Sequence, residues 1–287
     1  MSKLPHTFKN DIVFKLSFVK RQDLLRRLVA WILGIKLESI VEFTVRNPGM
    51  PPDFTDGKFC YLDIQMTVNG YEVNLEVQIK DEKNFRERVM FHWARVYTRT
   101  LQSGEDYVEL PHTIIISIVD FPLFDCEEFR SEFRPLEVSR YDLLSDKMCF
   151  LFFELKKLPK EIDGDDMLLL WLSLFRADTE EELEIIDALE VPELSDAIAT
   201  YRSVTASEEF QELERMREKA RIDEALALGN AWREGKRESD EEWKVVVADK
   251  DAEIADKDAV IADVKAELAD KDAEIERLRI MLNNKSE

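Results

Sequence analysis

The sequence is short of cysteine, of long apolar runs and of positive charge. Cys60, Cys126 and Cys149 stand alone among 287 residues, with no CxxC spacing. An odd number of unpatterned cysteines argues against a disulfide framework and indicates reduced thiols in a cytosol. The opening residues, MSKLPHTFKND, lack the apolar core of a signal peptide, and no apolar run approaches membrane-spanning length. We therefore expect a soluble, cytoplasmic protein.

Charge is unevenly distributed along the chain, whose formal net charge is -21. Residues 1–120 hold 16 basic and 16 acidic residues, so the whole negative excess lies in residues 121–287. An acidic protein is a poor general binder of nucleic acid, but the neutral first part weakens that objection. Nucleases that hold a metal in carboxylates can be acidic overall, because the cation supplies local positive charge.

Hydrophobic periodicity predicts an α/β fold for the first part of the chain. Helices are expected over residues 11–33, before Gly34, and over residues 84–103, before Gly104. Alternating or continuous apolar runs predict strands at residues 40–45, 59–68, 71–79, 113–119 and 148–155. The expected order up to residue 119 is helix, strand, strand, strand, helix, strand.

The chain beyond residue 160 is acidic and helical in pattern. Apolar residues recur there every seven positions, as in a coiled coil. They are Val247, Ile254, Ile261, Leu268, Ile275 and Leu282. The companion seam position is mixed: it holds Lys250, Lys257, Val264, Lys271 and Leu278, and lysine at a seam weakens association. We expect three parts, residues 1–160, 161–240 and 241–287, and a weak or conditional homo-oligomer through residues 246–282.

The strongest local signal is a β-hairpin over residues 58–80. Asn69-Gly70, between two apolar runs, predicts a two-residue turn that fixes how the strands pair. In that register one face of the hairpin is apolar and the other is nearly wholly polar. Asp63 then lies directly opposite Glu76, with side-chain roots about 4.5–5.5 Å apart. Gln78 projects from the same face two residues further along.

Asp63 and Glu76 form the candidate metal site. Two carboxylates at that separation repel by roughly 3 kcal/mol at an effective dielectric near 20. A hard divalent cation would cancel the repulsion, and Mg²⁺ characteristically takes one or two carboxylates with waters. A shared proton or a nearby arginine could also cancel it, or the polar face could simply meet water. The Gln78 amide can orient a water or a phosphate but is no strong base, so the metal would have to lower the pKa of the water.

A basic stripe follows on the next expected helix. Arg88, His92, Arg95 and Arg99 share one face, at spacings of four, seven and eleven residues from the first. Such a stripe beside a metal site suits contacts with DNA phosphates. The alternative is a solvated helix face, and His92 taken alone is better explained as a surface residue than as a metal ligand.

These elements and residues resemble the PD-(D/E)XK nuclease superfamily, and more narrowly the recombination-promoting nuclease (Rpn) family, also described as PD-(D/E)XK family transposases. The matching stretches are residues 10–15 (NDIVFK), 61–65 (YLDIQ), 74–78 (NLEVQ), Arg88, Tyr97, 102–107 (QSGEDY) and 216–223 (MREKARID). The resemblance covers residues 8 to about 238. It implies a restriction-endonuclease-like αβββαβ core, followed here by a helical region and a C-terminal coiled-coil-like helix.

The resemblance also implies roles for particular residues. Asp63 would be the motif aspartate and Glu76 the second acidic metal ligand, with Asp11 as an extra acidic residue near the metal. Gln78 stands where many superfamily members have lysine, which puts its part in water activation in doubt. Apart from the resemblance, the basic stripe on the helix makes Arg88, Arg95 and Arg99 the candidate DNA contacts.

The implied activity is Mg²⁺-dependent cleavage of DNA phosphodiester bonds, which can promote recombination or transposition or serve phage defence. A competing hypothesis is a catalytically idle PD-(D/E)XK-derived protein that acts as a binding or scaffold protein and assembles through its C-terminal coiled coil. Gln78, the acidic charge and the heptads favour it. A third possibility is that the acidic C-terminal region competes with DNA for the basic helix.

Overall fold

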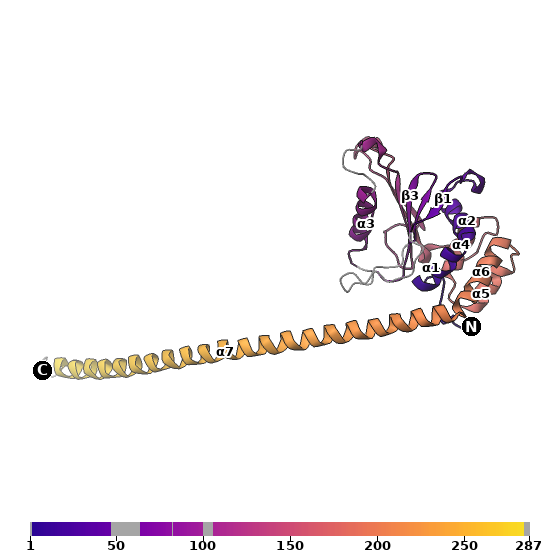
Figure 1. Cartoon of the computed structure of the whole chain (residues 1–287). Coiled ribbons are helices and arrows are strands. Elements are labelled where there is room, and N and C mark those ends of the chain that lie inside the picture. The colour runs from indigo at the N-terminus through magenta and orange to yellow at the C-terminus, as the bar shows by residue number, and fades with distance from the viewer. Residues whose placement is uncertain (1, 47–63, 82, 100–105, 284–287) are drawn as a thin grey trace. The chain divides into compact units, whose positions relative to one another are not determined.

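The computed structural model describes residues 2–46, 64–81, 83–99 and 106–283 (Figure 1). Asp63, the side chain of Arg99 and the expected helix end at Gly104 therefore lie outside the described residues. The chain forms two compact units, Met1–Arg215 and Met216–Glu287. The division at residues 160 and 240, which follows composition, stays a prediction.

The described part of the chain contains seven α-helices and six strands, besides short 3-10 turns. The helices are α1 (Asp11–Lys20), α2 (Gln22–Leu33), α3 (Phe85–Arg99), α4 (Met167–Arg176), α5 (Glu180–Asp187), α6 (Pro192–Thr205) and α7 (Glu208–Asn283). The strands are β1 (Phe43–Val45), β2 (Ile64–Val68), β3 (Tyr71–Gln78), β4 (Thr113–Val119), β5 (Arg130–Phe133) and β6 (Met148–Glu154). The α/β fold class is confirmed, with the predicted order of three strands, a helix and a strand after the N-terminal helices.

The six strands form one mixed sheet in the order β1-β2-β3-β4-β6-β5. The first three strands pair antiparallel, β3 pairs parallel with β4, and β4 pairs parallel with β6. β5 closes the other edge antiparallel to β6. Because β3, β4 and β6 run in the same direction, their carboxyl ends meet at one edge of the sheet.

The hairpin of β2 and β3 has the register that its turn predicts. Asn69 and Gly70 both have positive φ, 49° and 79°, as a two-residue hairpin turn of type I′ requires. The Asn69 side chain adds support, since its Oδ1 accepts from the backbone N–H groups of Val41 and Glu42. Paired residues run from Val68 with Tyr71 to Ile64 with Leu75, as predicted.

The prediction of one helix over residues 11–33 is wrong, because the helix is broken at Arg21. This residue has φ −114° and ψ 70°, and its guanidinium donates to Asp23 and Asp196. Residues 12–18 of α1 are all buried, whereas α2 buries one side only. A single straight helix could not bring both sets of apolar residues to the core. The helix ends at Gly34, as predicted, and Gly34 has the left-handed conformation.

Two further differences concern strands. The strand expected at residues 40–45 is limited to β1, because Leu37–Ser39 forms a 3-10 turn before it. Strand β5 was not predicted, since its sequence, RSEF, is charged and mostly exposed at the sheet edge. Neither difference affects the middle of the sheet, where β3 and β4 lie.

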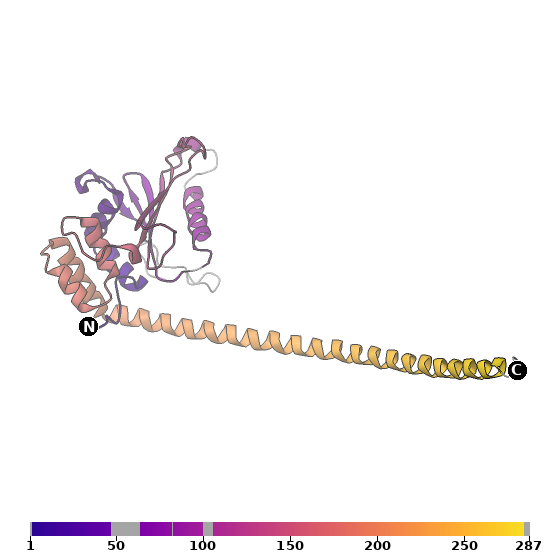
Figure 2. The same cartoon turned by 180° about the vertical axis from the view of Figure 1, so that it is seen from behind.

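The two faces of the sheet are covered differently. Helices α1, α2, α4 and α6 lie on one face and α3 on the other (Figures 1 and 2). These four helices pack against the apolar side of β2, β3, β4 and β6 and form the larger core with it. A smaller core joins Phe85 and Val89 of α3 to Ile115, Val119 and aromatic residues of β6. The acidic region beyond residue 160 thus supplies core helices to the same unit as the sheet.

The second unit consists of helix α7 from Met216 onward. The predicted long helix is confirmed, and every residue from 230 to 281 is exposed. The heptad residues Val247, Ile254, Ile261, Leu268 and Ile275 are each about half exposed. No helix in the described part of the chain is both long enough and apolar enough to span a membrane.

Candidate active site

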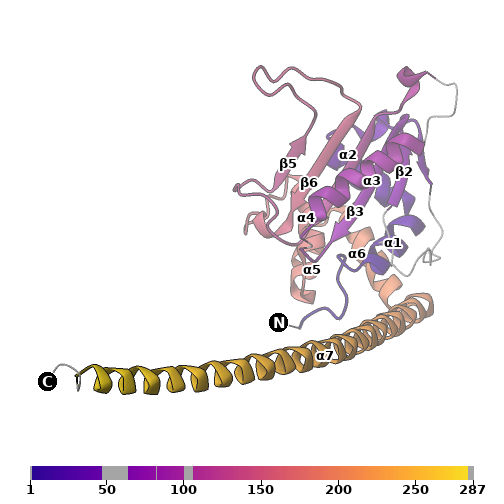
Figure 3. The ribbon, with the colours of Figure 1, turned by 90° about the vertical axis from the view of Figure 1, so that its left-hand side faces the viewer.

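Strand β3 is buried on both of its faces. Val73 and Leu75 point into the larger core, while Asn74, Glu76 and Gln78 alternate with them on the opposite face. Helix α3 lies over that side of the sheet (Figure 3). Glu76 is 4% exposed and Gln78 is 5% exposed. The polar face of the hairpin therefore does not simply meet water. Buried polar groups of this kind must be hydrogen-bonded or ion-paired to be tolerated.

Glu76 is held by a hydroxyl from the neighbouring strand. It lies beside Ser117 of β4 in the parallel register, and Ser117 Oγ donates to Glu76 Oε1 at 2.7 Å. Both residues are buried. The sequence analysis did not single out Ser117. After Thr113, it is the one hydroxyl in the apolar run of β4, TIIISIV. The bond fixes the direction in which the carboxylate presents its remaining lone pairs.

Gln78 is fixed at both ends of its amide. Its Nε2 donates to the backbone carbonyl of Lys80 at 3.0 Å, and its Oε1 accepts from Arg88 Nη2 at 3.0 Å. The guanidinium of Arg88 also lies over the ring of Phe85, 5.1 Å from its centroid. The structure thus brings together a predicted catalytic residue and a predicted DNA contact, and it puts a permanent positive charge beside the neutral Gln78 amide.

The rest of the α3 stripe is partly solvated. His92 is half-buried, and Arg95 is exposed with its guanidinium 5.9 Å from the ring centroid of Phe91. Burial, followed by the charges of Arg88 and Arg95, lowers the pKa of His92 below its ordinary 6.5. His92 is therefore neutral at pH 7, and it adds no charge to the stripe.

Asp11 opens helix α1. It is half-buried, and its Oδ1 accepts from the N–H of Ile12 at 3.1 Å. The preceding Asn10 caps the helix by accepting from the N–H groups of Ile12 and Val13 at 2.9 and 3.1 Å. Asn10 Nδ2 in turn donates to Glu214 Oε1 at 2.8 Å. A carboxylate in a first helical turn is favoured by the helix dipole, so this position suits an acidic side chain.

The first turn of α1 is tied to the same edge of the sheet as Gln78. Lys9, two residues before Asp11, forms an ion pair with Asp120, the residue after β4. The N–H of Asp120 donates to the backbone carbonyl of Gln78 at 3.0 Å. The carboxyl ends of β3 and β4 and the start of α1 therefore share contacts.

A known protein family matches most of the chain. The family model of the PD-(D/E)XK nuclease family transposases matches residues 8–231. The chain belongs to this family. The predicted resemblance is thereby confirmed, over nearly the range expected. No curated protein and no solved structure gave a match.

Membership of the PD-(D/E)XK family bears on what the site can bind. Nucleases of this kind act on DNA and generally use divalent metals, and carboxylates are the ligands that such hard cations prefer. Glu76 and Asp11 supply carboxylate oxygens within the described residues, which contain no group of three His, Cys, Asp or Glu able to hold a metal. The described β2–β3 ladder ends at Ile64 and Leu75, one pair before Asp63 and Glu76. The contact between Asp63 and Glu76 stays a prediction, but carboxylate oxygens are donors that fit a hard divalent cation.

Proposed function

We propose that this PD-(D/E)XK family protein is a Mg²⁺-dependent DNA endonuclease that hydrolyses phosphodiester bonds. The observation that supports it most is the buried Glu76 carboxylate, oriented by Ser117 at 2.7 Å on a strand that ends in the Gln78–Arg88 pair. A buried carboxylate in a water-poor site is a strong cation ligand once it is ionised. Asp63 and Glu76 would hold Mg²⁺, and Asp11 would be a further acidic residue near it.

Each residue of the candidate site then has a defined task. A bound Mg²⁺ supplies Lewis acidity and lowers the pKa of a water molecule. Ser117 keeps the Glu76 carboxylate in one orientation, which is what a ligand needs to be preorganised. The fixed amide of Gln78 orients water or the scissile phosphate. Arg95 and Arg99 would bind the DNA backbone away from the reacting bond.

Arg88 has a special place in this proposal because Gln78 replaces the usual lysine. Its guanidinium lies 3.0 Å from the Gln78 amide oxygen, so it can supply the positive charge that the amide lacks. A guanidinium does not lose its proton in proteins, so Arg88 would stabilise charge on the phosphate and not remove a proton from water. Arg88→Gln should lower the nicking rate on the order of 100-fold. Arg86→Gln is the matched control, because Arg86 lies on the same helix but donates to the carbonyl of Leu123.

The decisive experiment is nicking of supercoiled plasmid with and without Mg²⁺. Wild-type protein should nick, and Asp63→Ala should not, while both remain folded. Glu72→Gln is a matched control: Glu72 is buried on the same face of β3 but pairs with Arg46 at 2.6 Å. Full nicking by Asp63→Ala would refute the site assignment, and nicking that ignores Mg²⁺ would refute the metal dependence.

A second candidate is a catalytically idle binding or scaffold protein derived from the same fold. Two observations favour it, the neutral Gln78 at the motif position and the exposed heptad residues of α7. Titration with Mg²⁺ separates the two candidates. No heat of binding, no shift in melting temperature and no nicking would together establish the idle protein. A biological role in recombination, transposition or phage defence belongs to the first candidate only.

Self-association through residues 246–282 is part of both proposals. A second copy of the same helix would pack against the exposed stripe of heptad residues of α7. Lysines at the companion position would keep the assembly weak. Ile261→Asp should then shift the sedimentation coefficient to that of a monomer. Ala266→Asp lies off the stripe and serves as control. A wild-type chain that sediments as a monomer at every concentration tested would disprove the assembly.

A further inference from the structure

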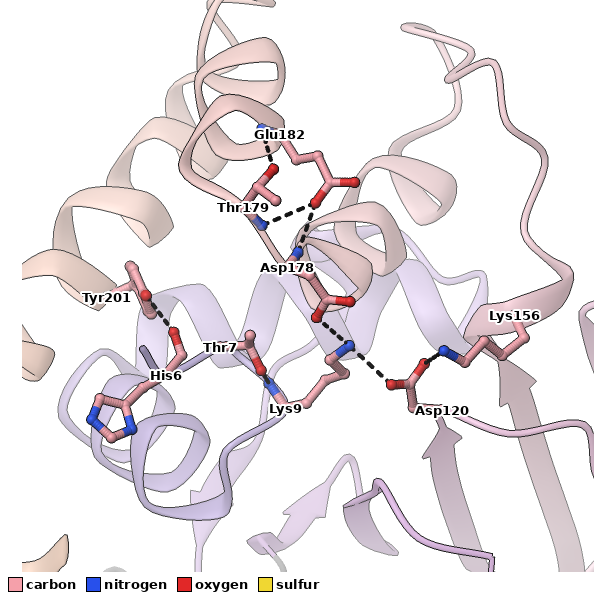
Figure 4. Close-up of polar contacts among 9 residues, drawn as sticks. All are labelled: His6, Thr7, Lys9, Asp120, Lys156, Asp178, Thr179, Glu182 and Tyr201. Carbon is pink, nitrogen blue, oxygen red and sulfur yellow. Dashed lines mark hydrogen bonds and ion pairs between the residues drawn. The ribbon is translucent and has the colours of Figure 1, made fainter. Parts of the chain in front are cut away.

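A buried lysine lies outside the residues assigned above. Lys9 is 5% exposed, and its Nζ donates to Asp178 Oδ1 at 2.7 Å and to Asp120 Oδ2 at 2.9 Å. Figure 4 shows it between the two carboxylates, with Lys156 on the other side of Asp120. Lys156 is 55% exposed and lies 3.4 Å from Asp120, whose own side chain is 10% exposed. Two lysines and two aspartates balance each other's charge.

Such a cluster adds little net stability, because burying charged groups costs solvation free energy. Burial lowers the pKa of Lys9, but the hydrogen bonds and charges of Asp178 and Asp120 outweigh it and raise the pKa above 10.5. Lys9 is therefore charged at every physiological pH. A well-packed apolar residue often stabilises a fold as much as a buried ion pair does. Ion pairs differ from apolar contacts in being directional, so the cluster suits the fixing of one geometry.

The partners of Lys9 are themselves firmly held. Asp178 precedes the capping box of α5, where its N–H donates to Glu182 Oε2 at 2.7 Å, and its carbonyl accepts from the N–H of Leu4 at 2.9 Å. Tyr201 Oη donates to the carbonyl of His6 at 2.5 Å, as Figure 4 also shows. The segment that leads to α1 is thus anchored along its length, with Lys9 as its last anchor.

The other end of the cluster reaches the candidate active site. Asp120 follows β4 directly and donates its N–H to the carbonyl of Gln78. Lys9 is separated from Asp11 only by Asn10, the N-cap of α1. The ion pair of Lys9 and Asp120 is therefore a short link between the end of the strand that carries Glu76 and Gln78 and the turn that carries Asp11.

We propose that Lys9 is a positioning residue, which fixes the first turn of α1 so that the Asp11 carboxylate stands at the metal-binding edge of the sheet. The inference rests on the proposed function, since it assigns Lys9 a role through Asp11. Supporting residues of this kind typically change metal affinity or activity by about 10–100-fold when they are lost. Lys9→Met keeps the length of the side chain and removes its charge.

A double-mutant cycle tests the link in the full-length chain. Wild type, Lys9→Met, Asp11→Asn and the double variant are compared by Mg²⁺ calorimetry and by plasmid nicking. Lys9→Met should weaken Mg²⁺ binding about 10-fold or more. In the Asp11→Asn background the same substitution should change Mg²⁺ binding by less than about twofold, because coupled residues are not additive. Equal losses in both backgrounds mean that Lys9 is merely structural, and they overturn the proposal.

Lys157→Met is the matched control for burial. Lys157 is 12% exposed and pairs at 2.8 Å with the fully buried Glu154, without contacting the start of α1. The Lys157→Met substitution should lower the melting temperature but leave Mg²⁺ binding unchanged. A similar loss of Mg²⁺ affinity in Lys157→Met would also overturn the proposal. If Lys9→Met fails to fold, Asp120→Asn replaces it in the cycle with the same expectations.

The two proposals fail in different ways. If the wild type binds Mg²⁺ but does not nick, the endonuclease proposal is refuted, and the calorimetric cycle still decides the role of Lys9. If the wild type binds no Mg²⁺, both proposals are refuted. Lys9→Arg keeps the charge and should retain most of the Mg²⁺ affinity that Lys9→Met loses, which a purely steric role would not predict.

Discussion

The two faces of β3 are equally buried but chemically opposite. Leu75 and Val73 face a core of helices α1, α2, α4 and α6, where burial by itself is favourable. Glu76 and Gln78 face α3, where burial is unfavourable unless each polar atom finds a partner. Ser117 and Arg88 are such partners. Burial of the apolar face accounts for the position of the strand, whereas the buried polar face calls for a function.

The largest expected effect is on the polar face. Glu76→Gln keeps the shape and the acceptor for Ser117 but removes the charge, so Mg²⁺-dependent nicking should be lost. The melting temperature should stay equal or rise, because a buried charge has been removed. Plasmid nicking and thermal unfolding measure both. A variant that nicks normally would show that the polar face is structural.

The neighbouring residue on the apolar face should behave in the opposite way. Leu75 is fully buried, so Leu75→Ala should lower the free energy of unfolding by about 2–5 kcal/mol. Nicking per folded molecule should be retained well below the melting temperature. Denaturant titration and nicking at low temperature provide the comparison. Loss of nicking without loss of stability would break the distinction between the faces.

Ser117→Ala removes one contact between the two strands that hold the site. The hydrogen bond to a charged group contributes about 1.5–3 kcal/mol to stability. The loosened Glu76 carboxylate should bind Mg²⁺ about 10-fold more weakly. Ser117→Thr, which keeps the hydroxyl, is the control. Unchanged Mg²⁺ affinity in the alanine variant would leave Ser117 a packing residue only.

The smallest effect expected is a pH dependence from His92. Its folded-state pKa is lowered by burial and by Arg88 and Arg95. As the pH falls below 6.5, the unfolded chain therefore takes up this proton before the folded chain does, and stability decreases. Well above pH 6.5 the residue is neutral in both states and contributes no slope. His92→Gln should flatten the curve of melting temperature against pH between 6.5 and 5, and an unchanged curve would contradict the assignment.

Local chemistry sufficed for some features of the fold. Asn69 and Gly70 adopt positive φ with little strain, so the hairpin turn and its register could be predicted from the sequence. The Ile-rich run of β4 and the left-handed Gly34 were equally predictable, because each depends on its own residues. The pairing of Asp63 with Glu76 follows from the same register and stays a prediction.

Other features depend on residues that are distant in sequence. At the break, Arg21 contacts Asp196, 175 residues later, and the change of direction lets both α1 and α2 bury their apolar residues. Ser117 lies beside Glu76 only because β3 and β4 pair in parallel, and Lys9 meets Asp120 and Asp178 only in the folded chain. By itself, the sequence determined the local turns, the alternation of faces and the acidic residues of the candidate site. Which partners satisfy those residues was decided by tertiary structure alone, since charge and hydrogen bonding act through space and leave no periodic pattern along the chain.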